Sequence, residues 1–163
     1  MTFSAGQLIG ESSAFPAIGD FNNDGLLEPF GFLNLGDWTF NIAPSLALDL
    51  IVAGYQGRIN RDNRVLDLDG DGNLDVVWNV YSDANVTGSF TLILFGDGAG
   101  GFSRVEERPD IIGFGETIVA ADFNNDGLVD IYSPVYTHLL GVDSAYLLLN
   151  EGGGVLGDNV AEV

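Results

Sequence analysis

Three short acidic segments, each running directly into apolar residues, constrain this chain more than any other feature of its sequence. They begin at Asp20, Asp67 and Asp122, read DFNNDGLLE, DLDGDGNLD and DFNNDGLVD, and all fit D-x-[DN]-x-D-G-x-x-[DE]. Two carboxylates about 5 Å apart repel by about 3 kcal/mol at an effective dielectric constant of about 20. A chain that crowds acids in this way needs a cation among them.

The protein itself has few cations to offer. It has five arginines and no lysine against 24 acids, which gives a formal net charge of -19. That charge excludes nucleic acids and anionic membrane surfaces as partners, because both require a basic surface. The chain is nevertheless 46% hydrophobic, too apolar for a disordered acidic segment. We therefore expect a folded domain whose acidic loops take their cation from solution.

Calcium is the cation that these loops suit best. Ca²⁺ binds six to eight oxygens, and short carboxylates at alternate positions of a tight loop supply them, whereas Mg²⁺ prefers to keep several waters. We expect side chains at loop positions 1, 3, 5 and 9 and the carbonyl at position 7 to bind the ion, with glycine at position 6 permitting the turn. The predicted ligands are Asp20, Asn22, Asp24, Leu26 and Glu28; Asp67, Asp69, Asp71, Asn73 and Asp75; and Asp122, Asn124, Asp126, Leu128 and Asp130.

The loops admit two other interpretations. An EF-hand requires a bidentate Glu at loop position 12, where this chain has Gly31, Trp78 and Ser133. Asp-Asn-Gly clusters also form plain turns whose side chains bond the backbone. Three spaced copies, each followed by a strand, favour up to three structural calcium ions. The middle loop, with four carboxylates, should bind tightest.

A second element recurs downstream of each acidic loop and predicts the fold. FLNLGDWTF (32–40), LILFGDGAGGF (92–102) and YLLLNEGGGVL (146–156) each read as a β-hairpin with a glycine-containing turn. The loops lie 47 and 55 residues apart, close to the repeat length of propeller blades. We predict one all-β domain, 1–163, with units at about 15–60, 61–115 and 116–163. SLALDLIVAG (45–54) fits a buried strand or a helix.

The acidic loop running into LDVVW, together with the LFGDGAGGF hairpin, resembles FG-GAP/VCBS repeats, the calcium-bearing blade units of integrin-type β-propellers and many secreted bacterial proteins. The resemblance implies four-stranded blades, an extracellular or cell-surface location, and a role in adhesion, glycan binding or architecture. The first unit departs from the pattern, because few residues separate Glu28 from its hairpin and a long segment follows.

Three blades form a partial propeller or propeller-like array with two open flanks. Such flanks leave edge strands that soluble proteins usually cover. We therefore expect a structural or adhesive protein that forms a homo-oligomer or filament through strand and edge contacts, without membrane insertion. No leader and no stretch long and apolar enough to span a bilayer is visible in the sequence.

The alternative is a carbohydrate-binding module. Trp38, Trp78, Tyr132 and Tyr136 could stack on sugars or fill the core, and Arg58, Arg61 and Arg64 could bind an acidic glycan or balance nearby acids. Asn85 begins a glycosylation sequon. We expect no enzyme, because the chain has no Cys, no Lys and only one histidine, His138, which leaves little material for a nucleophile and its base.

Overall fold

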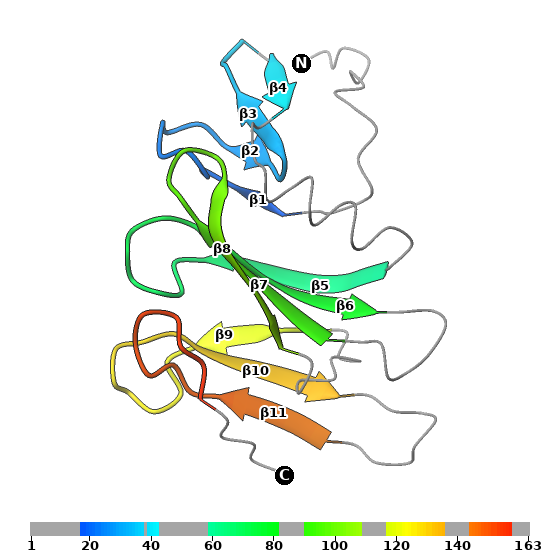
Figure 1. Cartoon of the computed structure of the whole chain (residues 1–163), viewed down its shortest axis with the longest axis vertical. Helices are drawn as coiled ribbons and strands as arrows, with labels where there is room; N and C mark the ends of the chain where they lie inside the picture. The colour runs from blue at the N-terminus through cyan, green and yellow to red at the C-terminus, as the bar shows by residue number, and fades with distance from the viewer. Residues whose placement is uncertain are drawn as a thin grey trace, which may run out of the picture.

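The computed structural model describes residues 17–37, 39–42, 59–81, 90–108, 117–135 and 144–157. Over these ranges the chain contains only strands, turns and loops, and every pair of strands is antiparallel. The strands form three groups stacked along the long axis of the molecule, and the described sheets do not close into a ring (Figure 1). The predicted all-β fold class is confirmed. Within this part of the chain, no helix is long and apolar enough to cross a membrane.

The middle repeat is a four-stranded sheet in the order β5-β6-β7-β8. Its strands are β5 (Ile59–Leu66), β6 (Asp75–Tyr81), β7 (Phe90–Gly96) and β8 (Phe102–Arg108). Every residue of β7, FTLILFG, is buried. Since alternate side chains of a strand point to opposite faces, a continuously apolar strand of this kind predicts a sheet that is covered on both sides.

The two outer repeats are less complete. In the first, β1 (Ile18–Gly19) pairs with β2 (Glu28–Pro29), and β3 (Phe32–Asn34) pairs with β4 (Phe40–Ile42). The third contains β9 (Val119–Ala121), β10 (Asp130–Val135) and β11 (Ser144–Leu148), in the order β11-β10-β9. The first unit, whose spacing indicated a departure from the repeat pattern, thus forms two two-stranded sheets instead of one sheet of four.

Two hydrophobic clusters join the repeats face to face. One face of the middle sheet, including Val76, Trp78, Leu92 and Leu94, packs against Ala17, Phe21 and Phe30 of the first repeat. The other face, including Val77, Ile93 and Phe95, packs against Ile118, Ile131, Leu148 and Leu156 of the third. Each cluster therefore belongs to an interface between repeats, and no repeat holds a core of its own among the described residues.

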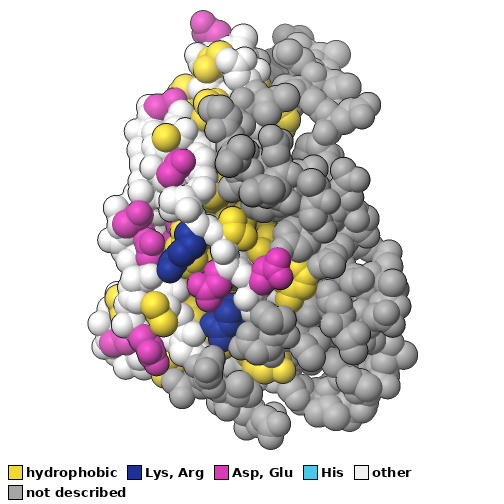
Figure 2. Space-filling model, viewed as in Figure 1, with side chains coloured by type: hydrophobic (Ala, Val, Ile, Leu, Met, Phe, Trp, Pro, Cys, Tyr) yellow, Lys and Arg dark blue, Asp and Glu magenta, His cyan; other side chains and the backbone are white. Residues whose placement is uncertain are grey.

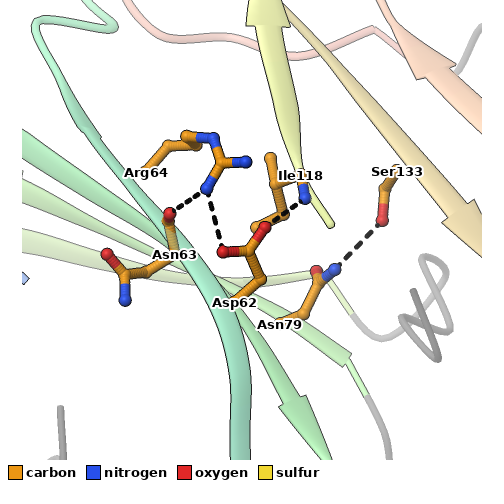
Figure 3. Close-up of polar contacts among 6 residues, drawn as sticks. All are labelled: Asp62, Asn63, Arg64, Asn79, Ile118 and Ser133. Carbon is orange, nitrogen blue, oxygen red and sulfur yellow. Dashed lines mark hydrogen bonds and ion pairs between the residues drawn. The ribbon is translucent and has the colours of Figure 1, made fainter. Parts of the chain in front are cut away.

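Polar contacts, partly or fully buried, fix the third repeat against the middle one (Figure 3). Asp62 on β5 accepts a hydrogen bond from the Ile118 backbone N–H at 2.6 Å. It also forms an ion pair with Arg64 at 2.9 Å. On β6, the Asn79 amide donates to the Ser133 hydroxyl at 3.2 Å. The pairing of Arg64 with Asp62 supports the interpretation that this arginine balances local charge.

All three acidic loops lie at one edge of the stack, because each connects the first two strands of its repeat (Figure 1). The glycine turns after β7 and β11 lie at the same edge (Figure 1). Acidic side chains are accordingly spread along this edge of the surface (Figure 2). The fold thus gathers the predicted ligands at one end of every sheet.

Candidate metal centres

The first aspartate of each loop organises the loop backbone. One carboxylate oxygen of Asp20, Asp67 and Asp122 accepts the N–H of the glycine five residues later, at 2.9 Å in all three loops. These glycines have φ of 88°, 89° and 88°, a conformation that other residues rarely adopt. Glycine at position 6 is therefore required by the turn, as the sequence predicted.

The fifth position repeats an equally constant contact. The carboxylates of Asp24, Asp71 and Asp126 each accept the N–H of the residue two positions later, at 2.8 Å. Those residues are Leu26, Asn73 and Leu128, whose carbonyls are the predicted seventh-position ligands. The three loops therefore share one conformation. Such bonds also occur in plain Asp-Gly turns, but each carboxylate has about four lone-pair sites, so they leave acceptor capacity for an ion.

All three ninth-position acids are buried, and in the middle and third repeats they connect the acidic loop to the glycine turn of the same repeat. Asp75 accepts N–H groups from Leu68 at 2.7 Å and from Gly96 at 2.8 Å. Asp130 does the same with Phe123 and Asn150, both at 2.8 Å. These carboxylates therefore hold loop and hairpin together, a structural role additional to the predicted ligation.

Carboxylates come close enough in two loops to share one cation. Ligand oxygens of Asp20, Asp24 and Glu28, and likewise of Asp67, Asp69 and Asp71, all lie within 4.8 Å of one another. At that separation like charges repel by several kcal/mol at a protein-like dielectric constant. Oxygen-only donor sets of this kind match the preference of Ca²⁺. The residues present in these two loops therefore fit a calcium ion.

Glu28 supplies independent support for a ligand in the first loop. Its side chain is fully buried, and Oε2 accepts the Phe21 N–H at 3.0 Å. Oε1 is also buried but has no hydrogen-bond partner among the described residues. Burial raises the pKa of Glu28, the backbone N–H of Phe21 and, least of all, that of Asn34 lower it, and the charges of Asp24 and Asp20 raise it further. A cation would satisfy the orphan oxygen and offset that repulsion.

The ninth acid of the middle loop, Asp75, is also buried, and its charged form is likewise disfavoured. Burial raises the pKa of Asp75 to about 6, even though hydrogen bonds from Gly96 and Leu68 oppose the shift and the charge of Asp69 adds to it. The cluster within 4.8 Å comprises Asp67, Asp69 and Asp71, and Asp75 lies behind it, close enough to Asp69 for their charges to interact. A divalent ion in the cluster would stabilise the charged form of Asp75. Asp67, Asp69, Asp71 and Asp75 thus remain the strongest predicted site.

The third loop differs from the others in exposure. In the described part of the chain, it does not bring three acidic ligand atoms within 4.8 Å. Its second residue, Phe123, is 44% exposed, whereas the equivalent Phe21 and Leu68 are 5% and 2% exposed. Calcium binding by Asp122, Asn124, Asp126, Leu128 and Asp130 stays a prediction that rests on the shared loop conformation.

Comparison with known proteins agrees with this geometry. Residues 67–133 match the family model for the FG-GAP-like repeat. The chain carries an FG-GAP-like repeat. The match runs from the first aspartate of the middle loop, through the third loop, to Ser133 on β10. No curated protein and no solved structure gives a significant match.

The structure describes two of the aromatic residues that were candidates for sugar stacking, Trp78 and Tyr132. Trp78 is 1% exposed and lies in the cluster between the first and middle repeats, so it fills the core. Tyr132 is partly exposed and packs beside Phe123. Trp38, Tyr136, Arg58, Asn85, His138 and the segment 45–54 lie outside the described residues, as does the side chain of Arg61.

Sequence reasoning missed the contacts that one repeat makes with the loop of another. The Asn150 side chain donates to the Leu68 carbonyl at 2.8 Å, and the Asn23 amide donates to Asn73 at 2.9 Å. Gly100 donates its N–H to the Phe21 carbonyl at 3.1 Å. The recurrence of Gly100 and Gly154 at one turn position was the available signal. The glycine turns after β7 and β11 thus cover the acidic loop of the preceding repeat.

Proposed function

We propose that this protein is a calcium-stabilised, extracellular β-repeat domain with a structural or adhesive role that associates with itself. The FG-GAP-like repeat and the all-β stack support a β-repeat domain of the structural or adhesive type. The extracellular or cell-surface location rests on the places where such repeats typically occur. The calcium ions hold the acidic loops in shape and take part in no reaction.

One observation carries the calcium assignment. Two loops each bring three carboxylates within 4.8 Å, and one of these carboxylates, Glu28, has a buried oxygen with no hydrogen-bond partner in the described residues. The net charge of the whole chain also favours bound cations. Three bound divalent ions add six positive charges to a formal net charge of -19 and bring it to -13.

Asp69→Asn is the sharpest test of this assignment. It gives the middle loop an Asn at position 3, which the two outer loops already have, and so should keep the loop folded. Isothermal titration with CaCl₂ should show the tightest site weakened by about tenfold, or about 1.4 kcal/mol. Glu106→Gln removes one negative charge outside the loops and should leave every calcium affinity unchanged.

Two outcomes of that titration would contradict the proposal. If the wild-type chain takes up no calcium, the loops are plain turns. If Glu106→Gln weakens binding as much as Asp69→Asn, calcium responds only to overall charge. Titration with MgCl₂ completes the comparison, because an oxygen cage of this kind should bind Mg²⁺ far more weakly than Ca²⁺.

We also propose that the domain is not an enzyme. The chain has no cysteine or lysine and a single histidine. The buried acids Glu28, Asp75 and Asp130 each accept backbone hydrogen bonds. Turnover of polysaccharide substrates by the purified chain would contradict this part of the proposal.

A further inference from the structure

The interface between the first and middle repeats shows what each end of the stack is built to contact. On the first repeat the surface centres on the ring pair Phe21–Phe30, with centroids 6.1 Å apart. The middle repeat covers it with Trp78, 4.7 Å from Phe30, and with Phe102, 5.3 Å from Phe30. This aromatic pair is therefore buried only because another repeat lies on it.

The third repeat presents an equivalent aromatic pair that no further repeat covers in the described part of the chain. Phe123 and Tyr132 occupy the equivalent loop and strand positions, with ring centroids 6.4 Å apart. Phe123 is 44% exposed, and Val119, the cross-strand partner of Tyr132, is 40% exposed. Ala17, equivalent to Val119, is 1% exposed. We call Val119, Phe123 and Tyr132 the tail face.

The first repeat presents the complementary surface at the opposite end. Val65 and Leu74 of the middle repeat pack onto the first repeat, where a Cβ on Gly19 would lie 3.0 and 2.8 Å from their side-chain carbons. The equivalent residues of the first repeat are Ile18 and Leu27. They are 61% and 64% exposed. We call Ile18 and Leu27 the head face.

We propose that the tail face of one copy of this chain binds the head face of a second copy, continuing the stack of repeats from molecule to molecule. The proposal rests on the proposed function, of which it specifies the self-association. A second copy is the occupant that the structure favours, because its Ile18 and Leu27 stand where Val65 and Leu74 pack against the cluster that holds the aromatic pair inside the chain. At the position of Trp78 the first repeat has Gly31, so the cover that a second copy provides is smaller. The contact is heterologous, so it yields chains or rings of copies.

The junction between copies should be weaker than the internal interfaces. Inside the chain, Gly100 and Gly154 lie so close to the preceding repeat that a Cβ would meet Leu33 and Phe95 at 2.4 Å. By sequence, Trp38 stands at this turn position in the first repeat. The close backbone contact cannot recur between copies, so association should be reversible and dependent on concentration.

Three variants test the two faces. Val119→Asp alters the tail face, Ile18→Asp alters the head face, and neither residue is a predicted ligand. Val105→Asp is the matched control, because Val105 is 41% exposed on β8 and belongs to neither face. Sedimentation velocity of each chain in millimolar CaCl₂, from low to high micromolar concentration, measures association. Circular dichroism and calcium titration confirm that each variant is folded and binds the ion.

The wild type and Val105→Asp should form larger species as concentration rises, while Val119→Asp and Ile18→Asp each stay monomeric. A mixture of those two should form dimers and nothing larger, because one copy keeps its head face and the other its tail face. A monomeric wild type, equal loss in Val105→Asp, or an unreactive mixture would overturn the proposal. Normal calcium binding in a monomeric wild type would defeat only the head-to-tail contact. Association without calcium binding would defeat only the metal assignment.

Discussion

Gly154 lies against Phe95 and Asp69 of the middle repeat with φ of 72°, and a Cβ there would meet their carbons at 2.4 and 3.0 Å. Gly152, in the same turn, has φ of 98° but open space around it. Alanine at either position should cost about 1–2 kcal/mol for the left-handed backbone. Gly154→Ala should lose a further 1–3 kcal/mol, roughly, because it overpacks the interface. Urea unfolding of both variants measures the difference, and equal losses would show that the glycine serves only the turn.

The buried carboxyl of Asp75 predicts how the calcium-free chain responds to pH. Its pKa is raised from 3.8 to about 6, mainly by burial, so the folded state favours the protonated form. The resulting stabilisation is complete below about pH 4 and is lost as pH rises through 6. In EGTA, melting temperature should therefore fall between pH 4 and 7. Asp75→Asn should flatten that part of the profile. An unchanged slope in Asp75→Asn would assign the fall to the general repulsion among the acids.

At the scale of elements, one buried polar chain joins β6, β7 and β10. Thr91 donates its hydroxyl hydrogen to Asn79 at 3.0 Å, and Asn79 donates to Ser133 at 3.2 Å; none of the three is more than 1% exposed. Asn79→Ala should cost about 1–3 kcal/mol, because the remaining partners stay buried without their bonds. A double-mutant cycle with Ser133→Ala should show coupling of at least about 0.5 kcal/mol. Additive losses would mean that the hydrogen bond between Asn79 and Ser133 contributes nothing to the joint between the two repeats.

Some features of these elements could be predicted from the sequence, and others could not. The acidic loops and glycine turns were predictable because their conformation is fixed locally, by aspartates that bond nearby N–H groups and glycines at positive φ. β7 was predictable from its unbroken apolar run. The hydrogen bonds from Gly96 to Asp75 and from Asn150 to Asp130 span 21 and 20 residues, and no local pattern indicates them. The spacing of the first unit indicated a departure from the repeat pattern, but not its division into two two-stranded sheets.

Across the whole molecule, calcium and net charge should act on stability in ways that an experiment can separate. At free calcium 100 times its Kd, each site adds about 2.7 kcal/mol, or about 8 kcal/mol for three sites. Since small domains are stable by only about 5–15 kcal/mol, EGTA should lower the melting temperature steeply or unfold the chain. Differential scanning calorimetry in calcium, and in EGTA with and without NaCl, provides the measurement.

The salt arm of that experiment distinguishes coordination from screening. At 1 M NaCl the Debye length falls to about 3 Å, so repulsion among the solvent-exposed acids of this chain, whose formal net charge is -19, is largely removed. Sodium cannot replace a divalent ion inside a cluster of carboxylates within 4.8 Å of one another. NaCl should therefore recover only a small part of the stability lost to EGTA. Full recovery by salt would mean that calcium acts as a diffuse counter-ion, and that the loops hold their shape through their own hydrogen bonds.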